Sequence, residues 1–124
     1  MQNSNSTMFE YINLDYLDSL IGDDLETKST MLSMLLDEIP EEIQKINDAH
    51  KANDISTLKN AAHKLKSTLA FIANDKMTVA NKAIEQIAKD NEGLEKLPEL
   101  IAIMNELQPL VLEDVKLAVQ QASK

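Results

Sequence analysis

The chain has 124 residues, a formal net charge of −9 and no cysteine. This length fits one domain with its own core. The acidic balance argues against a nucleic-acid-binding protein, because phosphate backbones attract basic faces, and the lack of cysteine excludes disulfides and thiolate metal sites. Apolar residues make up 44%, aromatic residues 3%, and glycine and proline are few, so the composition favours an all-α protein with an aliphatic core.

The start of the chain does not resemble a targeting segment. Met1 to Phe9 is polar, without a basic start or an apolar run, so no signal peptide is predicted. No apolar stretch approaches ~18 residues, the length needed to span a membrane. We therefore expect a cytoplasmic protein in which residues 1–11 form a disordered tail and residues 12–124 form one helical domain.

Apolar spacing predicts a short helix and then a long one. The short helix starts at Asn13 or Asp15 and ends at Gly22. The long helix runs from about residue 25 to residue 51, and Pro40 inside it should bend or briefly interrupt it. The apolar positions of the long helix step by four and three residues, as in an amphipathic helix: Leu32, Leu36, Ile39, Ile43 and Ile46.

Three further segments are predicted to be helical. The first spans residues 55–72 and is capped by Asp54, and the second spans residues 75–90. The last, residues 94–124, forms one long helix or two shorter ones, with a bend at Pro109. Four apolar-striped helices with short connections predict an all-α fold, an antiparallel four-helix bundle with a short additional N-terminal helix.

The predicted helix over residues 55–72 contains no acidic residue, although the chain has 21 of them. Its apolar positions form one stripe: Leu58, Ala62, Leu65, Leu69 and Ile72. His63 lies roughly 160° from Leu65 around the helix, so it points away from this stripe. The neighbours of His63 on the outer face include Lys59, Lys66 and the small residue Ser67.

Two interpretations of His63 are open. An exposed histidine on a helix is commonly an ordinary surface residue, which is how we interpret His50. The alternative is an imidazole kept accessible to accept a phosphoryl group, whose roughly two negative charges Lys59 and Lys66 can balance. Each exposed pairing is worth less than ~1 kcal/mol, so this helix can hold a phosphoryl group but cannot drive its transfer.

The next helix should place polar side chains beside His63. If the chain turns near residue 74 and the two helices are antiparallel, the level of His63 on the neighbouring helix is near residue 85. Gln86 stands at that level, and Lys82 and Lys89 lie about one turn away on either side. At this position Gln86 could hydrogen-bond the imidazole and fix its orientation. The pattern favours the other interpretation, a plain solvated polar face, for Gln86 and more clearly for Lys82 and Lys89.

Several segments resemble histidine-containing phosphotransfer (HPt) domains. The family signature Ala-His-x-Leu-Lys-Gly-Ser is similar to Ala62-His63-Lys64-Leu65-Lys66-Ser67-Thr68. The stretch Ile12–Leu17 also resembles the family's N-terminal helix. Ile39–Ile43, followed by Ala49 and Asp54, resembles the family's spacing between the second helix and the histidine helix. The resemblance covers roughly residues 12–90, and the remaining helix fits the family's closing bundle helix.

This resemblance implies a phosphocarrier in a two-component phosphorelay, not an enzyme. His63 would accept a phosphoryl group from a receiver-domain aspartyl phosphate and pass it to another receiver, and Lys66 would pair with that group. Ser67 stands where the family usually has glycine, so it bears on how a partner approaches. The expected partners are receiver domains and a hybrid histidine kinase. The protein itself is expected to be a monomer without a cofactor, with Mg²⁺ supplied by the receiver.

Other functional classes fit the sequence less well. The runner-up is an HPt-like module that docks receiver domains as an adaptor without being phosphorylated. A carboxylate metalloprotein needs Glu-x-x-His pairs, but Asn47 and Asn60 stand three residues before the two histidines. The sequence also shows no nucleophile–base constellation of a hydrolase and no phosphate-binding glycine-rich loop for ATP.

Overall fold

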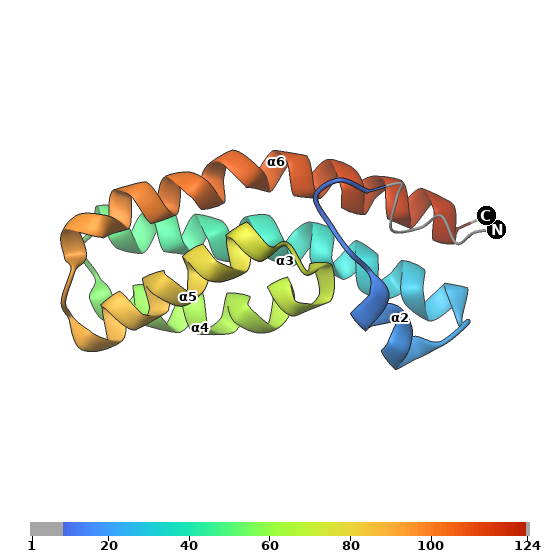
Figure 1. Cartoon of the computed structure of the whole chain (residues 1–124), viewed down its shortest axis with the longest axis horizontal. Helices are drawn as coiled ribbons and strands as arrows, with labels where there is room; N and C mark the ends of the chain where they lie inside the picture. The colour runs from blue at the N-terminus through green and yellow to red at the C-terminus, as the bar shows by residue number, and fades with distance from the viewer. Residues whose placement is uncertain (1–8, 124) are drawn as a thin grey trace.

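The structure, a computed structural model, describes residues 9–123, which are helices joined by short loops (Figure 1). The elements are α2 (Asp15–Ile21), α3 (Leu25–Lys51), α4 (Ile55–Ile72), α5 (Asp75–Asp90), the short 3₁₀ helix η1 (Leu94–Lys96) and α6 (Leu97–Ala122). Residues 9–123 contain no strand, so the all-α prediction is confirmed. No helix among them is long and apolar enough to cross a membrane.

The four long helices form an antiparallel bundle. Each of α3, α4 and α5 packs against the next helix along the chain, and α6 returns to lie beside α3 (Figure 1). The short helix α2 lies across one end of the bundle against α3 and α4. The predicted four-helix bundle with an additional N-terminal helix is therefore confirmed.

Side-chain caps fix where the helices begin. In each of α3, α4 and α5, the residue before the helix accepts a hydrogen bond from a backbone N–H three residues later, which satisfies one of the free donors of the first turn. The pairs are Asp24 with Thr27 (3.1 Å), Asp54 with Thr57 (3.1 Å) and Asn74 with Met77 (3.0 Å). These caps fix the short connections and hence which helices become neighbours.

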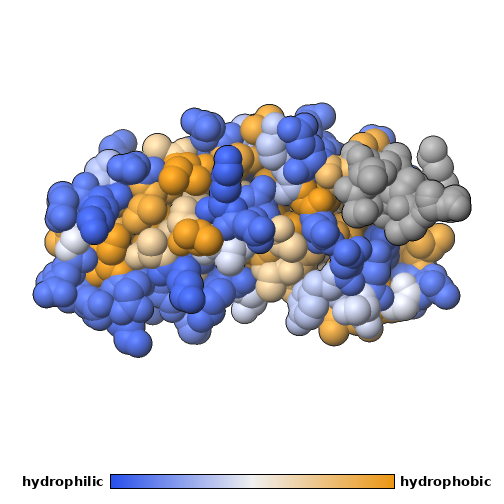
Figure 2. Space-filling model, viewed as in Figure 1, coloured by the Kyte–Doolittle hydropathy of each residue, from blue (hydrophilic) through white to orange (hydrophobic). Residues whose placement is uncertain are grey.

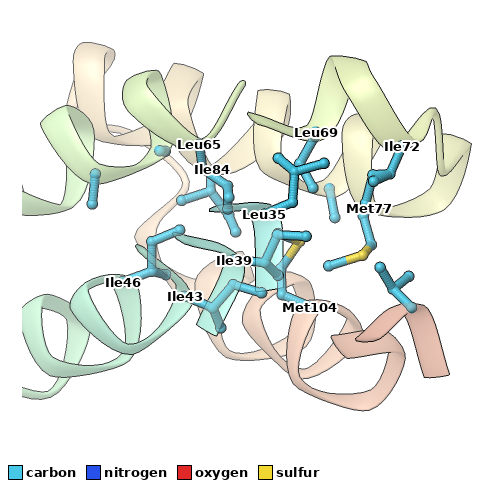
Figure 3. Packing of buried hydrophobic residues seen from close by; sticks show 14 of the residues in the cluster. Leu35, Ile39, Ile43, Ile46, Leu65, Leu69, Ile72, Met77, Ile84 and Met104 are labelled. Carbon is cyan, nitrogen blue, oxygen red and sulfur yellow. The ribbon is translucent and has the colours of Figure 1, made fainter. Parts of the chain in front are cut away.

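The core is aliphatic and is built from one stripe of each long helix. Side chains of α3, α4, α5 and α6 meet along the bundle axis (Figure 3). The fully buried residues include Leu32, Ile39, Ile43 and Ile46 of α3, Leu58, Leu65, Leu69 and Ile72 of α4, Met77 and Ile84 of α5, and Met104, Val111 and Val115 of α6. This stripe on α4 leaves the opposite face of that helix free to carry functional side chains.

The helices run through both internal prolines. Helix α3 continues without a break across Pro40, and α6 continues across Pro109. A proline removes one backbone donor, but the residues on both sides of Pro40, Ile39 and Ile43, are fully buried and hold the helix against the core. The last segment is therefore one long helix preceded by a single 3₁₀ turn.

The prediction of a disordered tail over residues 1–11 is wrong for its last residues, from Phe9 to Tyr11. Residues 1–8 lie outside the described part of the chain, but Phe9 is buried and both backbone polar groups of Tyr11 are hydrogen-bonded. Its N–H donates to Asp114 Oδ2 (2.8 Å), and its carbonyl accepts from Asn74 Nδ2 (2.8 Å). Phe9 belongs to the hydrophobic core and Tyr11 packs against it, so burial of these side chains also holds the stretch in place.

We expect Ile46→Ala to destabilise the bundle by about 2–5 kcal/mol, because it removes a fully buried side chain and leaves a cavity. Met34→Ala, on the same helix but 52% exposed, should change the free energy of unfolding by less than ~0.5 kcal/mol. Urea denaturation followed by circular dichroism measures both. Equal losses in the two variants would contradict the assignment of the buried stripe.

Candidate functional site

His63 stands in the middle of α4 on the face that points away from the core. Its side chain is 67% exposed, whereas Ala62 and Leu65 on either side of it are buried. The apolar stripe holds α4 in place, so the imidazole is presented to solvent from a rigid helix. This confirms the predicted exposure of His63.

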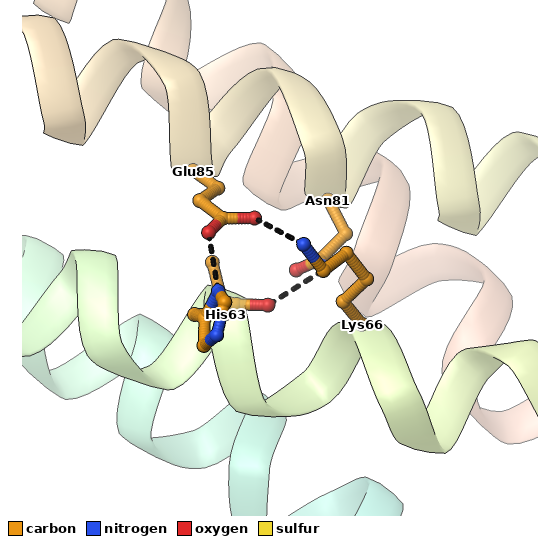
Figure 4. A network of polar contacts seen from close by, with 5 residues as sticks. His63, Lys66, Asn81 and Glu85 are labelled. Carbon is orange, nitrogen blue, oxygen red and sulfur yellow. Dashed lines mark hydrogen bonds and ion pairs between the residues drawn. The ribbon is translucent and has the colours of Figure 1, made fainter.

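A carboxylate from α5 joins His63 to Lys66. Glu85 Oε2 lies 2.7 Å from His63 Nδ1, and Glu85 Oε1 lies 3.7 Å from Lys66 Nζ (Figure 4). Because an ionised carboxylate can only accept hydrogen bonds, Nδ1 is the donor in this pair. The pKa of the Glu85 carboxyl is held below its usual value, first by the hydrogen bond from His63 and then by Lys66, despite partial burial. Glu85 is therefore negatively charged at neutral pH.

The hydrogen bond from Gln86 to His63 that the sequence left open is not formed. The level estimated from the turn, near residue 85, is right, but neighbouring residues of a helix point in directions about 100° apart. Glu85 faces α4, while Gln86 turns away and donates through Nε2 to Asp90 Oδ2 (2.7 Å) on its own helix. The sequence did contain a signal for the true partner, because the estimated level coincides with Glu85 itself.

A buried asparagine fixes the two helices beside the site. Asn81 lies one turn before Glu85 on α5, is buried, and donates through Nδ2 to the backbone carbonyl of Ala62 (2.8 Å; Figure 4). The bond is made at the residue immediately before His63. Sequence periodicity did not single out Asn81, although a polar residue on a buried helix face is the kind of departure that marks a positioning contact.

The lysine next to His63 is drawn away from it. Lys64 Nζ lies 3.0 Å from Glu42 Oε2 on α3, and Lys45 Nζ lies 3.6 Å from the same oxygen. Glu42 is only 1% exposed, and the hydrogen bond and charge of this carboxylate raise the pKa of Lys64. Lys64 therefore serves the α3–α4 contact, which leaves Lys66 as the lysine bonded to the His63–Glu85 pair.

The surface around His63 is basic in an otherwise acidic chain. Residues 55–90, which hold α4 and α5, contain six lysines and three acidic residues. The rest of the chain contains six lysines and eighteen acidic residues. A shallow hollow of about 370 Å³ beside the site is lined by Lys66, Lys82, Glu85, Gln86 and Lys89. Lys59 and Ser67 are exposed on α4, one turn before and after His63. The predicted site residues therefore share one face, with Lys82 and Lys89 beside them.

This arrangement suits an anion received on an imidazole. In the neutral ring the proton is held on Nδ1 by Glu85, so the lone pair is on Nε2. Lys59 and Lys66 are exposed about one turn away on the same helix, where they can contribute positive charge for an incoming anion. Within residues 9–123 no group of three or more histidine, aspartate or glutamate side chains is arranged to hold a metal ion.

Comparison with known proteins places these features in a family. The model of the Hpt domain family matches residues 30–123. The chain is similar in structure to the HPt domain of a Shewanella Hpt sensor hybrid histidine kinase, with a TM-score of 0.72 and 28% sequence identity over 90% of this chain and 95% of that one. A search of curated proteins found no significant match. With three quarters of its length matched and the fold shared, the chain belongs to the Hpt domain family, the phosphocarriers of two-component signalling.

Proposed function

We propose that this protein is a phosphorelay intermediate that accepts a phosphoryl group on His63 from the aspartyl phosphate of one receiver domain and passes it to another. The observation that carries the proposal is the hydrogen bond between His63 Nδ1 and Glu85 on an exposed helix face. It gives the imidazole a fixed orientation and leaves the other ring nitrogen to react.

The chemistry follows from the position of the proton. Nε2 attacks the phosphorus in line, an N–P bond forms, the P–O bond to the partner aspartate breaks, and that carboxylate leaves. The proton stays on Nδ1, so the phosphorylated ring carries a positive charge. Glu85 lies 2.7 Å from that nitrogen and offsets this charge. In the reverse step the same carboxylate keeps the proton in place while Nε2 departs from phosphorus.

In this scheme Lys66 changes its partner when His63 is phosphorylated. Before transfer, it pairs with Glu85 at 3.7 Å with its side chain more than half exposed. A phosphoryl group on Nε2 brings roughly two negative charges, which compete with the single charge of Glu85 for this ammonium. Lys66 therefore moves from the carboxylate to the phosphoryl group, and Lys59 and the Ser67 hydroxyl are within a helical turn as further contacts.

The proposed partners supply the metal ion that the transfer needs besides the nucleophile. The site offers a nucleophile and counter-charges, so the receiver supplies the Mg²⁺ that neutralises the developing charge on phosphorus. We propose receiver domains and a hybrid histidine kinase in the cytoplasm as partners of a monomeric carrier that has no catalysis of its own. A basic face on a chain of net charge −9 fits such partners, because receiver active sites are acidic.

We expect His63→Gln to abolish acceptance of phosphate, because the amide is not a nucleophile of this kind. The assay incubates the full chain with a labelled phosphorylated receiver domain and Mg²⁺, and follows acid-labile, alkali-stable label on the protein. The matched control is His50→Gln, which removes the other histidine and should retain full labelling. If a broad panel of receivers labels neither the wild type nor His50→Gln, the chain is a docking adaptor instead.

Lys66→Ala should lower the rate of transfer about fivefold, since the loss of an exposed pairing worth up to ~1 kcal/mol acts on the transition state. Lys116→Ala removes an exposed lysine of α6, far along the chain from the site, and serves as the control of equal charge change. Rapid-quench measurement of the single-turnover rate tests both. An equal loss in the two variants would show that only the net charge matters.

Glu85→Ala should reduce the population of the Nδ1–H form of His63 and slow transfer about three- to tenfold, because a hydrogen bond worth roughly 0.5–1.5 kcal/mol is lost. Glu85→Gln keeps an acceptor oxygen and should restore most of the Nδ1–H population. Nitrogen-15 NMR of the imidazole reads the tautomer directly, independently of any receiver. An unchanged tautomer in Glu85→Ala would remove Glu85 from the mechanism.

A further inference from the structure

A second surface feature runs along the seam between α5 and α6. Two adjoining hollows lie there, of about 660 Å³ and 520 Å³, and both are lined by Leu100. We call them together the α5–α6 groove. Its apolar lining consists of Val79, Ala80, Ala83 and Ile87 of α5 and Leu100, Ile103 and Leu107 of α6.

The groove leaves apolar surface uncovered. Val79 is 68% exposed, the largest exposure among the exposed large hydrophobic residues of the described chain. Among the four adjacent pairs of long helices, α5 and α6 approach each other over the smallest part of their backbones. In the space-filling view an apolar band runs between hydrophilic rims where α5 and α6 lie side by side (Figures 1 and 2). Contiguous apolar surface of this kind marks an interaction site more often than scattered residues do.

The shape of the groove fits a helix. On α5 the lining residues Val79, Ala83 and Ile87 follow at intervals of four, and on α6 Leu100, Ile103 and Leu107 follow at three and four. Eight residues of α5 rise about 12 Å, the length of a little more than two helical turns. A helix lying along this seam would insert apolar side chains at i, i+3/i+4 and i+7 between the two stripes, as in other helix-in-groove complexes.

The rims of the groove specify the charge of the occupant. Five acidic residues and two lysines line the two hollows: Asp75, Asp90, Glu92, Glu99 and Glu106, with Lys76 and Lys96. A partner with lysine or arginine beside its apolar stripe would meet complementary charge. A second copy of this chain is disfavoured, because its net charge of −9 opposes approach to an acidic rim.

We propose that the α5–α6 groove binds an amphipathic helix of a partner protein whose apolar stripe is flanked by lysine and arginine. The groove lies on a different side of α5 from the carboxylate of Glu85, which faces α4. Gln86 stands between the two surfaces, since it lines both the lysine hollow and the groove. A helix can therefore occupy the groove while His63 remains open to a receiver.

The experiment uses the full chain and a synthetic probe. The probe is a fluorescein-labelled peptide of about four helical turns, built of leucine and lysine with leucines at i, i+3, i+4 and i+7. Fluorescence anisotropy gives its dissociation constant, and amide NMR shifts map its position. We expect shifts centred on Val79 and Ile103, and at least tenfold weaker binding of the same peptide with glutamate in place of lysine.

Matched variants separate the groove from non-specific attraction to an acidic protein. Val79→Asp should weaken binding at least tenfold, while Leu117→Asp, at a 38% exposed site of α6 outside the groove, should not. Glu106→Lys should weaken binding more than Glu113→Lys, which makes the same charge change on an exposed residue of α6 outside the groove. Label transfer to His63 should persist in Val79→Asp, which shows that this variant is folded.

Three results would overturn the proposal. Equal weakening by Val79→Asp and Leu117→Asp, with shifts spread over the surface, would show plain electrostatic adsorption. Equal binding of the glutamate peptide would remove the assigned charge of the partner. Sedimentation equilibrium that showed a dimer of the free chain, lost in Val79→Asp, would make a second copy the occupant.

Discussion

The alignment of α4 against α5 is the constraint on which the site depends. His63 gains a defined proton position only because Glu85 arrives at its level, and a shift of one residue would present Gln86 or Ile84 instead. The buried stripe of α4 and the bond from Asn81 Nδ2 to the Ala62 carbonyl hold the two helices at that level. Since a buried polar group that loses its partner costs about 1–3 kcal/mol, slippage of one helix along the other is opposed just where the imidazole sits.

The carboxylate of Glu85 interacts with two positively polarised groups of the site. In the unmodified protein Glu85 binds both the imidazole and Lys66. Phosphorylation of Nε2 would create a positive ring, which strengthens the bond from Nδ1 to Glu85, and a phosphoryl group of opposite sign, which attracts Lys66. The two effects separate the lysine from the carboxylate without breaking the contact that orients the ring. A neutral side chain in place of Glu85 could orient the ring but could not offset its charge.

The helices and the core followed from the sequence because burial has a period that can be counted. Leu58, Leu65 and Ile72 were expected on one face and are buried there, and Asp54 caps α4 as its side chain predicts. The hydrogen-bond partner of His63 could not be predicted in the same way. Counting residues from the turn gives a position along the axis of α5, but the choice between Glu85 and Gln86 depends on the direction in which each side chain points around that axis. That direction is set by the packing of Ile84 and Ala88 in the core, a tertiary fact that a single helix does not carry. The α5–α6 groove was missed for a similar reason: Ile87, Leu100 and Leu107 have the apolar spacing of core positions, but their side chains are only partly buried.

The distribution of charge gives α5 two different sides. Toward α4 it borders a surface rich in lysine, where Lys66, Lys82 and Lys89 line a hollow together with Glu85, the partner of His63. Toward α6 it borders an apolar groove with an acidic rim. Because exposed charges act over about a Debye length, near 10 Å at ordinary ionic strength, partners of opposite charge are drawn to different sides of the same helix. An acidic receiver approaching His63 and a basic helix approaching the groove would then not compete, and Gln86, an uncharged residue on the ridge between them, repels neither.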